Sequence, residues 1–370
     1  MVTRSFIPVG QGAFYREKFG DEDNTINVVY DCGTLYSKKV DIEDTIRKEF
    51  NENEDIDAVF ISHLDRDHFS GIGYLVNYCN VKRIYLPLMN ERSKILMKIK
   101  NKINVKSNYE FIYDFIDDPY TAFGKYGLIS DDKEVPEINF VREGESRDFK
   151  NDNYRYIDSG KKIAELNFGD VWEYIPYNFR QEKRMDELES LIEKKFNKTL
   201  KNDELKELFE KNDLDKLIEA YRGVKGSFNT NSMVLFSGIR VDSVQQQISS
   251  DDIIGCKKDC ILFDLVLKFS GALYTGDYDM SGGNKWKDLK DKYKDYWKYI
   301  GCIQVPHHGS FYNYNEELSS MQSYFVMSAS TDNKFHHPSH KVLVDILSKE
   351  HFPFVVTENK ESRVDFKIDW

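Results

Sequence analysis

One short segment constrains this chain more than any other, residues 61–71, which read ISHLDRDHFSG. Four side chains that can bind a metal lie within six residues of it: His63, Asp65, Asp67 and His68. The apolar run DAVFI at 57–61 comes before them, and a glycine-containing turn sequence follows. We therefore expect a buried strand that ends in a loop carrying two imidazoles and two carboxylates, which are ligands for Zn, Mn and Fe. A polar loop holding two histidines by chance is the alternative, but a buried strand rarely ends in such a cluster without a use for it.

The composition predicts a folded chain with a large core. It has 370 residues, 40% of them hydrophobic, with 23 Tyr and 25 Phe, which suits one large α/β unit with insertions and excludes general disorder. The formal net charge is −11. Such a charge disfavours a protein that coats nucleic acid through bulk electrostatics, although a metal site and a local basic patch can still hold one stretch of phosphate backbone.

Membrane and disulfide classes are not indicated. No run of about 18 apolar residues occurs, so we predict no transmembrane helix. The first eight residues lack the apolar region of a signal peptide and resemble a first strand. The cysteines are odd in number and irregularly spaced, at Cys32, Cys79, Cys256, Cys260 and Cys302. We interpret them as reduced, mostly buried thiols of a cytoplasmic protein without membrane contact.

Most of the chain alternates between strand and helix patterns, which is typical of α/β proteins. Expected strands lie at 2–9, 26–31, 57–61, 81–87, 162–166, 171–176, 233–236, 262–269, 272–277, 302–306, 324–328, 354–357 and 363–368. Expected helices lie at 41–50, 71–79, 285–299 and 341–347. The short GQG at 10–12 is too weak for a dinucleotide fingerprint, and we expect a tight turn where the backbone approaches another segment.

Two segments depart from this alternation. Residues 90–160 begin with a basic helix at 91–106 and continue as polar, irregular chain, which suggests an insertion or lid. The basic helix could face nucleic acid, but a solvated helix face is the commoner explanation. Residues 181–221 are charged and predict two or three helices, either for contact with a partner or as a solvated cover.

Polar side chains gather just past the ends of the expected strands. These are His63 and His68, then His307 and His308, then His336, His337 and His340, together with Asp31 and Asp277. Ligands of α/β sheets bind outside strand ends. We therefore expect most of these side chains to meet at a single centre.

The linked motifs resemble those of the metallo-β-lactamase superfamily. In chain order they are GQG, Asp-x-Gly, His-x-Asp-x-Asp-His, Thr-Gly-Asp, Pro-His-His-Gly-Ser and His-Pro, and they are most similar to the hydrolase domain of ComEC-type competence proteins. The resemblance spans nearly the whole chain apart from 90–160 and 181–221. It implies one domain over 1–370, a four-layer αββα sandwich with helical insertions at those two places and a binuclear metal centre at one edge.

The same resemblance implies a ligand set, which is His63, Asp65, Asp67, His68, Asp277, His307, His308 and His337. The first two would hold one metal and the next two the other, with Asp277 as the bridge and His337 at the second site. Of His307 and His308, one would be a ligand and the other a contact to the substrate or leaving group, in an order that stays open. Asp67 would also orient the attacking water, Asp31 would support the loop from behind, and His336 and His340 receive no role.

Two departures from the superfamily pattern affect the metal. The usual loop is His-x-His-x-Asp-His, and here Asp65 stands at the second histidine, as in the ComEC group. A carboxylate makes the site harder and more negative, which favours Mn²⁺ or Mg²⁺ relative to Zn²⁺. No histidine lies between His68 and Asp277, so the first metal is either weakly held or takes His307 or His308. We expect two divalent ions, Mn²⁺ or Zn²⁺, with Mg²⁺ as a further option.

The resemblance implies a metal-dependent phosphodiesterase or nuclease acting on DNA. Stand-alone relatives occur in bacterial operons that include anti-phage defence systems, and the helices at 181–221 would suit a partner protein there. One alternative is a hydrolase of a small phosphodiester or ester, such as a cyclic nucleotide or lactone, which the net charge of −11 slightly favours. A second alternative is a regulatory or partner-binding module with a degenerate site, which the missing histidine supports.

Overall fold

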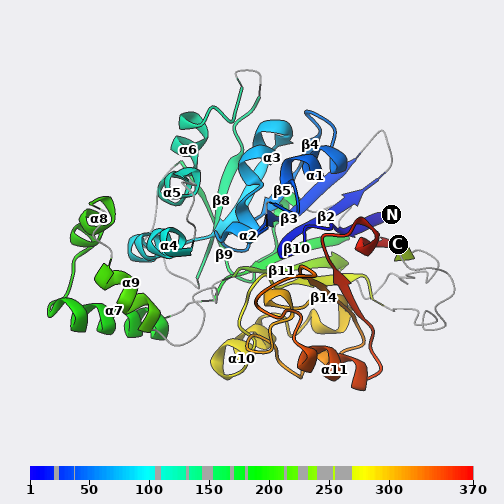
Figure 1. Ribbon diagram of the computed structural model, residues 1–370. Helices are drawn as coiled ribbons and strands as arrows, with labels where there is room; N and C mark the ends of the chain where they lie inside the picture. The colour runs from blue at the N-terminus through cyan, green and yellow to red at the C-terminus, as the bar shows by residue number, and fades with distance from the viewer. Residues whose placement is uncertain are drawn as a thin grey trace. The chain divides into compact units, whose positions relative to one another are not determined.

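The computed structural model describes residues 1–20, 25–36, 38–104, 110–130, 133–143, 153–166, 171–179, 182–211, 215–223, 232–239, 253–254 and 269–369. They form two compact units. The first unit comprises 1–87, 130–179 and 229–370, and the second comprises 88–129 and 180–228. The first unit holds the two large sheets and is described first (Figure 1).

The first sheet has the strand order β12-β17-β1-β2-β3-β5-β7-β8-β9. Its strands are β1 Val2–Phe6, β2 Gly12–Phe19, β3 Ile26–Thr34, β5 Ala58–Phe60, β7 Arg83–Pro87, β8 Glu137–Arg142, β9 Arg155–Asp158, β12 Ile253–Ile254 and β17 Val364–Ile368. The strands from β17 to β3 run antiparallel to their neighbours, whereas those from β3 to β9 run parallel. A separate two-stranded parallel sheet consists of β4 Asp55–Ile56 and β6 Asn80–Val81.

The second sheet has the order β10-β11-β13-β14-β15-β16. Its strands are β10 Trp172–Tyr177, β11 Val234–Ile239, β13 Gly271–Tyr274, β14 Ile300–Gln304, β15 Tyr324–Ser328 and β16 Pro353–Val356. The four strands from β13 to β16 are parallel. Parallel strands end at the same edge of a sheet, so the loops that follow β13, β14 and β15 are brought together.

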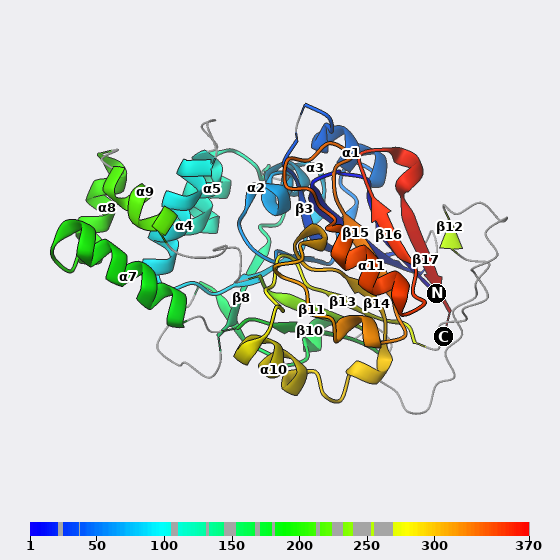
Figure 2. The same cartoon turned by 60° about the horizontal axis from the view of Figure 1, so that its bottom comes forward.

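Helices cover the outer face of each sheet. On the side of the first sheet lie α1 Ile42–Glu49 and α3 Ile72–Tyr78, with the short α2 Arg66–Phe69 between them in the chain. On the side of the second sheet lie α10 Gly283–Lys292 and α11 His340–Ser348 (Figures 1 and 2). Single 3-10 turns lie at Ala164–Leu166, Trp297–Tyr299, His307–Gly309, Leu318–Ser320 and Lys360–Ser362. The arrangement confirms the expected αββα sandwich.

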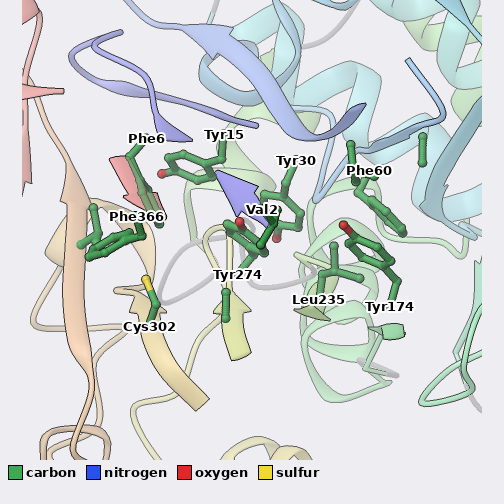
Figure 3. Packing of buried hydrophobic residues seen from close by; sticks show 14 of the residues in the cluster. Val2, Phe6, Tyr15, Tyr30, Phe60, Tyr174, Leu235, Tyr274, Cys302 and Phe366 are labelled. Carbon is green, nitrogen blue, oxygen red and sulfur yellow. The ribbon is translucent and has the colours of Figure 1, made fainter. Parts of the chain in front are cut away.

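The main core lies between the two sheets and is rich in aromatic rings (Figure 3). Tyr15 and Tyr30 of the first sheet stack on Tyr274 of the second, with ring centroids 5.8 and 5.0 Å apart. Phe60 and Tyr174 meet across the same interface at 5.7 Å. Each buried ring of this size contributes about 1.5–3 kcal/mol by leaving water, and the stacking adds to that. A second core packs α10 and α11 against the outer face of the second sheet.

The sequence pattern does not predict β2, because charged residues interrupt its alternation. Glu17 is nevertheless only 2% exposed, and it accepts hydrogen bonds from Arg4 at 2.7 Å, Tyr174 at 2.6 Å and Tyr274 at 2.9 Å. Arg4 is 1% exposed and also donates to the backbone oxygen of Ser270. A buried charge pair is tolerated when its remaining hydrogen-bonding groups are satisfied, and this network lets a charged strand enter the core.

The second unit is helical. Its helices are α4 Glu91–Asn104, α5 Glu110–Asp117, α6 Pro119–Lys125, α7 Glu182–Phe196, α8 Asn202–Glu210 and α9 Asp215–Gly223. It has its own apolar core, formed by Ile95, Leu96, Ile99, Ile192, Leu200, Leu205, Leu217 and Ala220. The last three helices agree with the two or three expected at 181–221.

Lysines of the basic helix α4 make contacts within this unit. Lys98 pairs with Asp117, and its ammonium lies 5.7 Å from the ring centroid of Phe209. The ammonium of Lys102 lies 4.7 Å from the same ring. These contacts favour the ordinary helix face over a nucleic-acid interface for α4.

Several expected elements differ from the structure. The chain from the end of the basic helix to residue 160 was expected to be polar and irregular, but α5 and α6 form within it. The strands β8 and β9 also extend the first sheet there, since the apolar run INFV of β8 pairs with β7. The strand expected at 162–166 is a 3-10 turn at Ala164–Leu166. The helix expected at 285–299 ends at Lys292. The strand expected at 262–269 lies outside the described residues except for its last position.

Two other expectations concern cysteines and membranes. Cys32, Cys79 and Cys302 are buried free thiols, as expected, whereas Cys256 and Cys260 lie outside the described residues. Within the described chain, no helix combines the length and the apolar character needed to cross a bilayer.

Candidate metal centre

The segments that follow four strands supply the site. The loop with His63 and His68 follows β5 of the first sheet, and Asp277 follows β13 of the second. His307 and His308 follow β14, and His337 lies between β15 and α11. Both sheets therefore contribute to one centre, as the strand-end pattern predicts.

Glycines allow the first turn and β3 to approach the metal loop. A β-carbon added at Gly12 would lie 2.2 Å from the backbone oxygen of Gly33. One added at Gly33 would lie 2.7 Å from the backbone of Asp67 and His68. Any side chain at these positions would push the loop away, which explains why the turn at 10–12 contains glycine.

The expected ligand atoms converge. Two groups of side chains place their nitrogen and oxygen ligand atoms within 4.8 Å of one another, His63 with Asp67 and His68, and His68 with Asp277 and His308. Asp65 Oδ2 lies 3.5 Å from His63 Nε2. His307 Nε2 lies 3.6 Å from Asp277 Oδ2. Seven of the eight expected ligands are thus within one cluster, and two adjacent groups share His68.

The eighth, His337, lies at the edge of this cluster. Its ring centroid is 5.5 Å from that of His307 and 6.3 Å from that of His308. Asn333 holds its backbone, accepting from the His337 N–H at 2.8 Å and donating to the His337 carbonyl at 2.7 Å. His336 and His340 are exposed, and His351 packs on Phe325, so none of these three joins the cluster.

The histidines of the cluster are oriented by contacts to Nδ1. His68 Nδ1 lies 2.8 Å from Asp31 Oδ2, and His63 Nδ1 lies 2.9 Å from Ser62 Oγ. His307 Nδ1 lies 2.9 Å from Asn313 Oδ1, and His308 Nδ1 lies 2.8 Å from the carbonyl oxygen of Ser328. When Nδ1 is held in this way, Nε2 is the nitrogen left to face the centre, which is the usual arrangement of metal-binding histidines.

Buried serines and Asp31 hold the loops behind the ligands. Asp31 accepts from the Ser62 N–H at 2.6 Å and from the Ser62 hydroxyl at 2.7 Å, so it supports the loop from behind, as expected. Ser232 Oγ lies 3.1 Å from His63 Nδ1 and accepts from the Asp277 N–H at 2.8 Å. The segment between His68 and Asp277 therefore contributes a serine behind the centre.

Electrostatics keep the carboxylates of the cluster ionised. Burial opposes ionisation of Asp277, but the neighbouring His307 and His68 outweigh it and hold the pKa of its carboxyl well below the usual value. Asp67 is affected in the same direction, since His68 and His308 outweigh its burial and lower its pKa. At neutral pH both side chains are therefore available as anionic ligands.

The donor set fits divalent metal ions. The Nε2 atoms of His63 and His68 are buried and face carboxylates, with His63 Nε2 3.5 Å from Asp65 Oδ2 and His68 Nε2 3.1 Å from Asp277 Oδ1, and neither has a well-aligned hydrogen bond among the described residues. Buried polar atoms are normally satisfied, and two such nitrogens facing ionised carboxylates indicate a cation between them. Imidazole and carboxylate together suit Zn²⁺ and Mn²⁺, and the carboxylate share suits Mn²⁺ and Mg²⁺.

Sequence reasoning missed the residues that orient the ligands, namely Ser62, Ser232, Asn313 and Asn333. Ser62 and Asn313 lie close in sequence to expected ligands, so a search for small polar neighbours of each histidine could have found them. Ser232 is distant from every ligand in sequence, and only the fold brings it to His63.

Comparison with known proteins identifies one segment. Residues 22–94 match the family model described as the metallo-beta-lactamase superfamily. The matched segment contains the loop with His63 and His68. No curated protein matches the sequence.

Solved structures with some similarity are distant. MEM-A1, a subclass B3 metallo-beta-lactamase from a soil metagenome library, is 10% identical with a TM-score of 0.32, over 82% of this chain and 76% of that one. The long form of RNase Z from yeast is 9% identical with a TM-score of 0.38, over 89% of this chain and 37% of that one. Unliganded yeast PDE1 is 8% identical with a TM-score of 0.40, over 99% of both chains.

Proposed function

We propose that this metallo-beta-lactamase superfamily domain hydrolyses phosphodiesters, with DNA as its substrate. The observation that carries the proposal is the ligand cluster, in which three carboxylates, those of Asp65, Asp67 and Asp277, stand among the histidines. Hard carboxylate ligands suit Mn²⁺ and Mg²⁺, and these are the ions that proteins use to hold phosphates. The resemblance of the His-x-Asp-x-Asp-His loop to ComEC-type domains supports the same substrate class.

Two divalent ions bound here would polarise a phosphate and lower the pKa of a water molecule between them. In this proposal the ligands are His63, Asp65, Asp67, His68, Asp277, His308 and His337. Asp67 additionally orients the attacking water. Its Oδ2 is 3.2 Å from His308 Nε2, so its side chain is fixed in direction.

The surroundings of His307 and His308 suggest an order for the roles that the sequence leaves open. His308 is 3% exposed and has its Nδ1 fixed by a backbone carbonyl, which suits a ligand. The His307 side chain is 19% exposed, and its Nδ1 is fixed by the Asn313 side chain. We assign His307 as the group that gives a proton from Nε2 to the leaving oxygen when the bond between phosphorus and that oxygen breaks.

A small phosphodiester or ester is the second candidate substrate. The net charge of −11 favours it, because a strongly acidic protein repels a long polyanion unless local positive charge compensates. A regulatory module with a degenerate site is disfavoured by the buried, converging ligand atoms. The ComEC-type subgroup, a role in anti-phage defence and a partner bound by α7 to α9 remain predictions from the sequence.

The test combines metal analysis with substrate choice. Purified protein is assayed with Mn²⁺, Mg²⁺ or Zn²⁺ on plasmid, single-stranded DNA, RNA and bis-p-nitrophenyl phosphate. We expect cleavage of DNA that is abolished in Asp67→Asn and His68→Ala and retained in His340→Ala, the control with an exposed histidine outside the cluster. Cleavage of the small diester without any polynucleotide would favour the second candidate, and no bound metal with no turnover would favour the regulatory module.

A further inference from the structure

The exposed aromatic side chains of this protein gather beside the candidate metal centre. Among the described residues, three aromatic side chains count as exposed, and these are Phe311 at 38%, Tyr312 at 84% and Phe335 at 45%. They are called the aromatic group below. No other Phe, Tyr or Trp ring is exposed among the side chains that the structure describes, so the concentration of these three in two short loops calls for a function.

Phe335 is joined directly to the centre. Its ring stacks on His337 with centroids 5.9 Å apart and an interplanar angle of 26°. The His337 ring in turn lies 5.5 Å from that of His307, which is the more exposed histidine of the cluster. Phe335 is 45% exposed, and only the His337 ring separates it from the group proposed to protonate the leaving oxygen.

Phe311 and Tyr312 are held on the other segment of the same site. They lie between Ser310 and Asn313, which are only 3% and 4% exposed. The Ser310 N–H donates to the His307 carbonyl at 2.9 Å, and the Asn313 side chain binds His307 Nδ1 at 2.9 Å. The turn is thus anchored at both ends to the centre, and it projects its two rings outward.

Positive charge accompanies the rings. The Lys341 ammonium lies 4.5 Å from the ring centroid of Phe311, and the Lys334 ammonium lies 5.2 Å from that of Phe335. Both lysines are exposed. Aromatic rings next to lysine ammonium groups are the combination that binds single-stranded nucleic acid, with bases stacked on rings and phosphates on lysines.

From these observations we propose that the aromatic group is a base-stacking platform, and that the substrate strand is unpaired where it crosses the metal centre. Bases on the two sides of the scissile phosphate stack on Phe335 and on Tyr312, while Lys334 and Lys341 contact flanking phosphates. A duplex hides the faces of its bases, so the platform selects single strands. This inference rests on the proposed phosphodiesterase function only for the place of the cut phosphate.

Local positive charge explains how a protein with a net charge of −11 can bind a polyanion. The lysines face the phosphates at short range, whereas the acidic surface elsewhere is screened beyond about 8 Å at physiological salt. Stacking itself is insensitive to the charge of the protein. A polyanion can therefore bind at this place on an acidic protein.

Binding without turnover tests the platform. Fluorescence anisotropy in EDTA compares a single-stranded 15-mer, its duplex, and the same strand with abasic sites in the centre. We expect Tyr312→Ala and Phe335→Ala each to weaken binding of the intact single strand by about 5- to 150-fold, the range of one stacked base. Binding of the abasic strand should change less than twofold, and Tyr312→Phe should restore wild-type affinity.

The controls separate the possible failures. Leu347→Ala removes a comparable apolar side chain, 53% exposed on α11, and should leave binding unchanged. Lys341→Gln should reduce the slope of log affinity against log salt by about 0.7, the value for one phosphate of a single strand. Equal binding of duplex and single strand, or an equal loss in Leu347→Ala, overturns the platform, and the latter points to a protein-docking surface instead.

Turnover distinguishes this inference from the proposed function. If the metal-loaded protein cleaves no phosphodiester but binds single strands in a Tyr312-dependent way, the proposed function fails and the platform stands. If it cleaves DNA and the KM for single strands is unchanged in both aromatic variants, the platform fails and the proposed function stands. Where both hold, the variants raise KM for single strands and leave kcat within about twofold.

Discussion

Replacing Asp31 by Asn should weaken metal binding without unfolding the protein. Asp31 is fully buried and touches no metal in our assignment, yet three donors point at its carboxylate. These are the Ser62 N–H at 2.6 Å, the Ser62 hydroxyl at 2.7 Å and His68 Nδ1 at 2.8 Å. Asn is the suitable replacement because the backbone φ of Asp31 is +54°, a conformation that Asn tolerates better than Ala does.

The magnitude follows from these contacts. The Asn amide offers one acceptor oxygen, so its NH₂ group must face at least one of the three donors. Loss of a hydrogen bond to a charged group costs about 1.5–3 kcal/mol. Removal of a carboxylate behind a metal-binding histidine typically lowers metal affinity by 10- to 100-fold, which corresponds to about 1.4–2.8 kcal/mol. We expect a loss of Mn²⁺ affinity in this range and a comparable loss in the free energy of unfolding.

Calorimetric titration of metal-free protein with Mn²⁺ measures the affinity, and urea unfolding measures the stability. Asp345→Asn is a matched control, because Asp345 also accepts from hydroxyl groups, those of Tyr314 and Ser319, but on α11. It should lose stability and keep its metal affinity. An Asp31→Asn protein that binds Mn²⁺ within threefold of the wild type would refute the positioning role of Asp31.

Three further outcomes test the fold and its charges. Gly33→Ala should lower the free energy of unfolding by about 3 kcal/mol or more, because the added methyl group would meet backbone atoms at 2.7 Å. Gly124→Ala is the control: its methyl group would meet nothing within 4 Å, so the change should be neutral or stabilising. Thermal unfolding of the two variants measures the difference. Glu17→Gln should destabilise by about 3–5 kcal/mol in urea titration, since it leaves a buried arginine without its carboxylate. Burial raises the pKa of Glu358, but hydrogen bonds from Thr331 outweigh it and lower the pKa to about 2. The carboxylate therefore adds at most about 3 kcal/mol to the free energy of unfolding above its unfolded pKa of about 4.5, and this contribution is lost as pH falls toward 2. In urea unfolding, the difference in stability between pH 7 and pH 3 should be smaller for Glu358→Gln than for the wild type.

Much of the site could be predicted from sequence because its chemistry is local. The run DAVFI predicts a buried strand, and the residues HLDRDH that follow it predict metal ligands at the end of that strand. Asp277, His307 and His308 are likewise each placed by the strand immediately before them. Parallel strands then bring these ends to one edge, so a one-dimensional pattern predicts a three-dimensional cluster.

Other features depend on contacts between distant residues. The sequence pattern does not predict β2, because charged residues interrupt its alternation. The strand is tolerated in the core because Arg4 and Tyr174 donate hydrogen bonds to Glu17. Ser232 lies behind His63 although 169 positions separate them. No local pattern carries such information, because the free energy that selects these positions comes from burial and hydrogen bonds that form after the sheets pack.

The sequence by itself indicated the candidate ligands and the carboxylate at Asp65, since each lies in a short run of residues, and the αββα class followed from the resemblance of motifs spread along the chain. Only the tertiary structure decided which nitrogen of His68 and of His308 faces the centre, because the partners of their Nδ1 atoms, Asp31 and the Ser328 carbonyl, come from separate segments. It also placed Phe335 on His337 and Phe311 under Lys341. Exposure of a ring beside a buried cluster is a property of the folded surface, and the order of residues along the chain does not reveal it.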